Sequence, residues 1–96
     1  MDTAPEANNM DLFKILTTLP HHSQMGMFEN DRSVPVWEAK HGAGWATTDL
    51  LACAERLEAA AQANQGVEWG DVRSRSINRD QARFLRRVAE LRSTAA

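Results

Sequence analysis

Residues 47–65 read TTDLLACAERLEAAAQANQ, and this stretch decides the fold class. Its apolar side chains recur at spacings of three and four residues, the period of one buried helix face, and are Leu50, Ala54, Leu57 and Ala61. Thr47 or Thr48 is a suitable N-cap, Asp49 favours the first turn, and Gly66 is a suitable C-terminal stop. The stretch therefore predicts an amphipathic helix that packs against other helices.

Two more helices are predicted, one on each side of this stretch. The first begins at Asn9, a good N-cap, and ends at Pro20. Its apolar stripe consists of Leu12, Ile15, Leu16 and Leu19. The other begins near Asn78, where Gln81 completes a capping-box pattern, and frays by Ser93. Its core edge consists of Phe84, Leu85, Val88 and Leu91.

The segment 21–45 has a different character, because short apolar runs alternate with polar and glycine-rich turns. This pattern predicts a short β-hairpin, in which Pro35 restricts its strand to a sheet edge. Residues 1–9 lack a set of large apolar side chains and are expected to form a flexible tail. The sequence thus predicts a mainly α domain over residues 10–93, with three principal helices and a short hairpin.

Length and composition restrict the class of protein. A chain of 96 residues forms one domain with a thin core, because much of its hydrophobic content is alanine. We therefore expect a homodimer that buries part of helix 48–65 or the N-terminal helix. The single cysteine, Cys53, excludes an intramolecular disulfide, and with no apolar leader at the N-terminus the expected compartment is the cytoplasm. No apolar run approaches the length of a membrane span.

Charge is divided unevenly along the chain. Residues 71–96 contain seven arginines and three acidic residues, whereas residues 1–70 contain four basic and ten acidic residues. Arg79, Arg83 and Arg86 are spaced to share one helix face. This face is a solvated surface, a contact for an acidic protein partner, or a nucleic-acid footprint. The acidic overall balance argues against nucleic acid.

The residue types that carry chemistry do not form a recognisable motif. His21, His22, His41 and Cys53 match no zinc-ligand spacing, and Cys53 is expected to pack as a small hydrophobe. The glycines of His41-Gly-Ala-Gly-Trp45 lack both the third glycine of a dinucleotide loop and a Walker lysine. We therefore predict no catalytic, cofactor-binding or metal site, and a protein that is not an enzyme.

Adaptable and aromatic side chains are concentrated between residues 10 and 37. Apart from Met10, they are Phe13, Met25, Met27, Phe28 and Trp37. Such side chains either fill a core or serve as contacts at recognition surfaces. A core of three short helices has limited room for all of them. We therefore predict that this group forms a protein-binding surface.

Three stretches carry a resemblance to a known family. They are Asn9-Met-Asp-Leu-Phe-Lys14, the break Pro20-His-His22, and the stretch from Trp37 to Trp45 ahead of the alanine-rich helix. Over its whole length the chain resembles the QslA-like quorum-sensing antiactivators. The resemblance implies a small, dimeric, helical, non-enzymatic protein that binds the ligand-binding domain of a LuxR-type transcription factor and prevents it from dimerising on DNA.

Two alternatives are kept beside this expectation. One is a nucleic-acid-binding accessory protein that uses the arginine-rich C-terminal helix. The other is a phage-type inhibitor of a bacterial defence complex, a class with a similar composition. The resemblance assigns no site residue in this chain.

Overall fold

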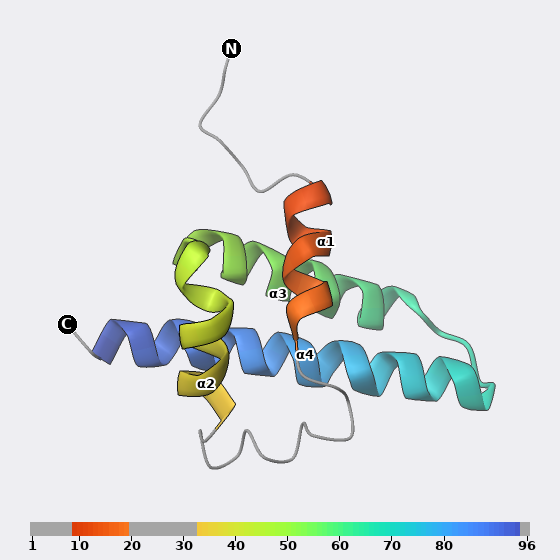
Figure 1. Ribbon diagram of the computed structural model, residues 1–96. Helices are drawn as coiled ribbons and strands as arrows, with labels where there is room; N and C mark the ends of the chain where they lie inside the picture. Colours follow the sequence, from red (N-terminus) through yellow and green to blue (C-terminus); the bar gives the residue numbers. More distant parts are fainter. Residues whose placement is uncertain (1–8, 20–32, 95–96) are drawn as a thin grey trace.

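The computed structural model describes residues 9–19 and 33–94, and over these residues the chain is helical with no strand (Figure 1). Its elements are the α-helices α1 (Asn9–Thr18), α2 (Ser33–Lys40), α3 (Thr47–Ala63) and α4 (Trp69–Thr94), and the short 3-10 helix η2 (Gly42–Gly44). The predicted mainly α class is confirmed. Of the predicted tail, residues 1–8 lie outside the described residues, and Asn9 begins α1. None of the described helices combines the length and apolar character needed to cross a membrane.

The helices α3 and α4 lie side by side and antiparallel, joined by residues 64–68 (Figure 1). Helix α1 crosses α3, and α2 packs against α4 nearer its C-terminal end. The core lies between these helices, and its largest fully buried side chains are Ile15, Leu50, Cys53, Phe84, Leu85 and Val88. An apolar stripe on each of α1, α3 and α4 faces this core, as the helical spacing predicted.

The boundaries of α3 differ slightly from the prediction. Its N-cap is Ala46, which makes no side-chain cap, and the Thr47 hydroxyl accepts a hydrogen bond from Arg92 at 3.0 Å instead. The helix ends at Ala63, two residues before the expected end. Gly66 follows the helix in the connecting loop, where a side chain would overlap the carboxylate of Asp71. Its role is therefore to allow a close approach.

The prediction that the last helix begins near Asn78 is wrong, because α4 begins at Trp69. The Asp71 carboxylate accepts a hydrogen bond from the Glu68 N–H at 3.3 Å, which is one half of a capping box. Arg75 donates to the loop carbonyls of Asn64 at 3.0 Å and Gly66 at 2.7 Å. These contacts stabilise about two additional turns at the start of α4, so only residues 64–68 connect it to α3.

The predicted hairpin is also wrong over residues 33–40, which form α2. Pro35 lies in the first turn of this helix, where a backbone N–H would have no intrahelical partner and its loss is tolerated. Trp37 is 3% exposed, and its burial against other helices compensates for the shortness of α2. The other half of the predicted hairpin falls within residues 20–32, outside the described residues.

We predict that Gly42→Ala destabilises the fold and that Gly44→Ala does not. A side chain at Gly42 would overlap the ring of Trp37 and the carboxylate of Glu38, whereas one at Gly44 would enter open space. We expect Gly42→Ala to lower the free energy of unfolding by about 1 to 3 kcal/mol, the usual effect of overpacking. Gly44→Ala should change it by less than about 0.5 kcal/mol. Urea denaturation compares the two, and equal values would contradict the packing described for Gly42.

Candidate functional site

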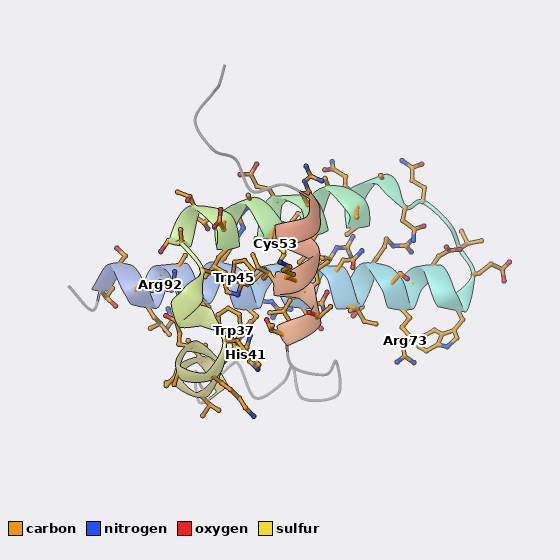
Figure 2. The ribbon with its side chains drawn as sticks, turned by 45° about the horizontal axis from the view of Figure 1, so that its top comes forward. Trp37, His41, Trp45, Cys53, Arg73 and Arg92 are labelled. Carbon is orange, nitrogen blue, oxygen red and sulfur yellow. The ribbon has the colours of Figure 1, made fainter. Side chains whose placement is uncertain are left out.

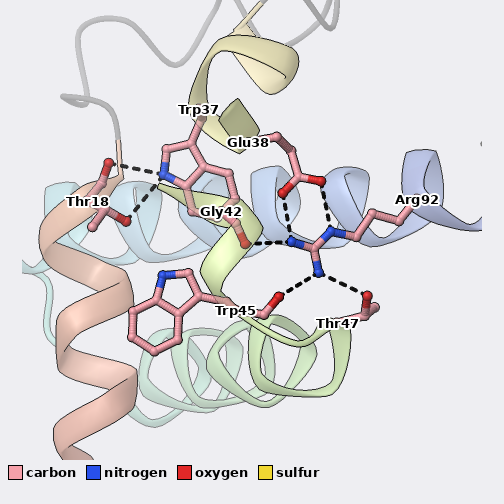
Figure 3. A network of polar contacts seen from close by, with 7 residues as sticks. All are labelled: Thr18, Trp37, Glu38, Gly42, Trp45, Thr47 and Arg92. Atoms are coloured by element: carbon pink, nitrogen blue, oxygen red, sulfur yellow. Dashed lines mark hydrogen bonds and ion pairs between the residues drawn. The ribbon is translucent and has the colours of Figure 1, made fainter. Parts of the chain in front are cut away.

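The guanidinium of Arg92, on α4, is the centre of the largest polar network among the described residues (Figure 3). Nε and Nη2 donate to the two carboxylate oxygens of Glu38 at 2.8 and 2.7 Å. Nη2 also donates to the Gly42 carbonyl at 2.7 Å, and Nη1 donates to the Trp45 carbonyl at 2.9 Å and the Thr47 hydroxyl at 3.0 Å. The five N–H groups of arginine therefore meet five acceptors.

This network holds the structure together and leaves no donor for a ligand. The side chains of Arg92 and Glu38 are 21% and 27% exposed, so their charges are partly withdrawn from water. The hydrogen bonds from Arg92 to Glu38 raise the pKa of Arg92 above its ordinary value. A bidentate pair of this kind fixes orientation as well as charge. Arg92 therefore fixes the positions of α2, η2 and the start of α3 relative to α4.

Trp37 connects α2 to both α1 and α4. Its indole Nε1 donates to the carbonyl oxygen of Thr18 at 3.1 Å and to the Thr18 hydroxyl at 3.2 Å. Its ring meets that of Phe84 edge to face, with centroids 5.4 Å apart. Trp37 is thus a core residue, which corrects the expectation that it is an exposed contact for a protein partner. A buried indole with a satisfied N–H is typical of a core.

The other members of the predicted protein-binding group are not described. The side chain of Phe13, on α1, lies outside the described part of the chain. Met25, Met27 and Phe28 fall within residues 20–32, also outside it. Their assignment to a binding surface stays a prediction.

The three predicted arginines all lie on α4 and are exposed, but two of them have acidic partners. Arg86 reaches across to α3 and donates through Nε and Nη2 to both carboxylate oxygens of Glu58, each at 2.7 Å. These bonds from Arg86 lower the pKa of Glu58. Arg83 pairs with Asp80 one turn earlier on α4. Arg79 has no hydrogen-bond or ion-pair partner among the described residues.

An exposed apolar cluster that was not predicted from the sequence lies at the end of the α3–α4 hairpin. Val67 is 87% exposed, Trp69 is 73% exposed, and Val72 is exposed as well. Arg73, also exposed, projects from the same end of α4, far from Arg92 (Figure 2). The spacing of Phe84, Leu85 and Val88 could have indicated this cluster, because it defines the buried face of α4. If that buried stripe is extended back through α4, Trp69 and Val72 fall outside it.

Of the four residues considered as metal ligands or nucleophiles, Cys53 and His41 lie in the described part of the chain, whereas His21 and His22 lie outside it. Cys53 is buried, and that burial outweighs the charge of Arg56 and raises the pKa of the thiol to about 11. The thiol therefore stays protonated near neutral pH, and its packing as a small hydrophobe is confirmed. His41 is exposed. Within the described residues, no group of three His, Cys, Asp or Glu side chains is arranged to hold a metal ion.

Comparison with known proteins gives no relative: no family model matches the chain, and neither the curated proteins nor the solved structures contain a significant match.

We predict that Arg92→Lys destabilises the fold far more than Arg83→Lys. Lysine keeps the charge of Arg92 but presents three donors on one nitrogen, so it leaves several acceptors of the network unsatisfied. We expect a loss of about 2 kcal/mol or more. The Arg83 side chain is 70% exposed and pairs only within its own helix, so Arg83→Lys should cost less than about 1 kcal/mol. Urea denaturation measures both free energies of unfolding. Similar losses in the two variants would show that the Arg92 network does not stabilise the fold more than a surface ion pair does.

Proposed function

We propose that this protein is a non-enzymatic inhibitor that acts by binding another protein. Its proposed target is the ligand-binding domain of a LuxR-type transcription factor, whose dimerisation and DNA binding it blocks. The choice of target rests on the sequence resemblance to quorum-sensing antiactivators. The inference that the protein binds another protein, and does not catalyse a reaction, rests on the exposed apolar cluster at the end of the hairpin.

The cluster consists of Val67, Trp69 and Val72, and it is the observation that carries the proposal. Four large hydrophobic side chains are exposed among the described residues, and these are three of them. They lie within six consecutive positions, whereas most other large apolar side chains that the structure describes face the core. Exposed apolar groups gathered in one place favour a partner, whereas scattered ones need no explanation. Tryptophan is also among the residues most enriched at binding hot spots.

The described residues give less support to the alternatives. Duplex DNA is bound through several phosphate contacts, and the pairing of Arg83 and Arg86 with acidic residues reduces the charge available for them. The antiparallel α3–α4 hairpin also keeps α4 packed along α3, unlike the crossed recognition helix of a helix-turn-helix. A phage-type inhibitor would act by the same kind of binding on a different target. The proposed setting is the cytoplasm.

We predict that Trp69→Ala abolishes inhibition without unfolding the protein. The wild-type chain should bind a purified LuxR-type ligand-binding domain in calorimetry and release the full regulator from its DNA in a mobility-shift assay. Because Trp69 is exposed, its removal should leave the melting temperature unchanged and weaken binding by about 2 kcal/mol or more.

The matched control is Val36→Ala, since Val36 is exposed on α2, away from the hairpin end. It should bind like the wild type. A wild-type chain that fails to bind such a domain, or that binds the DNA directly, would contradict the proposed function.

We also propose that the protein is a homodimer through α3. Ala59, Ala60 and Ala63 are exposed on this helix, and such small side chains allow a second helix to approach closely. Sedimentation at micromolar concentration should give twice the 10.7 kDa of one chain. Ala60→Glu should give the single-chain mass with helicity retained. A wild-type monomer would refute the dimer.

A further inference from the structure

The outer side of α4 over residues 69–79 is a continuous surface that mixes aromatic, aliphatic and basic groups. Its members are all exposed and recur at helical spacing: Trp69, Val72, Arg73, Ser76 and Arg79. We name this set the Trp69 face. Residues three, four and seven apart lie on one side of a helix, so the five side chains form one strip. At 1.5 Å per residue, the strip is about 15 Å long.

Most arginines of α4 are occupied within the chain, but those of the Trp69 face are not. Those with partners are Arg75, Arg83, Arg86, Arg87 and Arg92. Arg73 and Arg79 make no hydrogen bond or ion pair with any described residue. Both are exposed on α4, one and seven residues after Val72. The positive charge of α4 that is left for an external partner therefore lies along the Trp69 face.

The start of α4 is held in place before any partner arrives. Asp71 caps the Glu68 N–H, Arg75 holds the carbonyls of Asn64 and Gly66, and the Gly66 N–H donates to the Asn64 side chain at 3.0 Å. A surface fixed in this way loses little conformational freedom on binding. The Trp69 face is thus presented on a rigid helix end.

From this arrangement we propose that the Trp69 face binds an acidic, apolar segment of a partner protein, with aliphatic side chains covering Trp69 and Val72 and carboxylates pairing with Arg73 and Arg79. This inference rests on the proposed function and names the chemistry of its partner. The charge of the face is opposite to that of the chain as a whole, whose net charge is −2. An acidic segment is therefore attracted to this face, whereas the rest of the chain carries a net negative charge.

Charge also argues against a second copy of the chain or nucleic acid as the partner of the Trp69 face. A second copy docked through the same face about a two-fold axis would bring like-charged arginines together. Nucleic acid would gain only two free arginines here, while the acidic remainder of the chain repelled it. Carboxylates on a protein segment satisfy both arginines and leave the apolar groups to pack.

The test uses the full chain and a synthetic amphipathic helical peptide made of leucine and glutamate. Burial of Trp69 should shift its fluorescence to shorter wavelength as the peptide is titrated, and Trp69→Phe should remove that signal. Arg73→Glu should weaken binding about tenfold or more, because it places a like charge against the peptide. Arg56→Glu is the matched control, since it makes the same charge change at an exposed position on α3 and should leave the affinity within about twofold.

Three outcomes would overturn the inference. Equal binding of a peptide with lysine in place of glutamate would remove the role of charge. Duplex DNA bound through Trp69 and Arg73 would assign the face to nucleic acid, and concentration-dependent self-association lost in Trp69→Ala would assign it to a second copy.

The experiments distinguish failure of the proposed function from failure of this inference. If the peptide binds but the LuxR-type domain does not, only the proposed target is wrong; if that domain binds equally to the wild type and Arg73→Glu, only the acidic partner is wrong.

Discussion

The five hydrogen bonds of the Arg92 guanidinium are the interaction on which the arrangement of the helices depends. They join a side chain near the end of α4 to Glu38 on α2, to the η2 turn and to the beginning of α3. A partly covered arginine must find acceptors for all its N–H groups, and the carbonyls of Gly42 and Trp45 need donors in turn. Both needs are met only when the segment between α2 and α3 folds closely around Arg92.

Fixing α2 in this way also determines where α1 lies. Trp37 is one residue before Glu38, so the position of Glu38 at Arg92 places the indole ring against Phe84. The indole N–H then points to the C-terminal end of α1 and bonds to Thr18. Gly42 allows this because it has no side chain beside the ring. One polar network and one aromatic side chain thus connect all four α-helices, since α3 and α4 pack along each other.

The elements predicted correctly from sequence are those whose signal is local. The apolar period of α3 and the leucine stripe of α1 place both helices to within about two residues, the usual uncertainty of a helix boundary. Helix α2 was misread because Val34-Pro-Val-Trp37 is short, apolar and β-branched, and it becomes a helix only when Trp37 is buried by α1 and α4. The early start of α4 was missed because the hydrogen bonds from Arg75 reach loop carbonyls 9 and 11 residues earlier, beyond the three- and four-residue spacing of a helix pattern.

The same reason explains why Trp37 was assigned to a binding surface. Composition shows that Trp37 and Trp69 are large and apolar, but composition does not show that the first is core and the second is surface. Counting charges likewise found an arginine-rich segment without showing which arginines are used internally. In the structure, Arg75 bonds to the loop before α4, Arg86 pairs with α3 and Arg92 pairs with α2. The arginines of α4 without such a partner among the described residues therefore lie in its first half, where Trp69 is exposed. A solvated helix face exposes charged side chains alone. We infer a recognition surface here because arginines without a partner in the described part of the chain share a helix face with exposed apolar side chains.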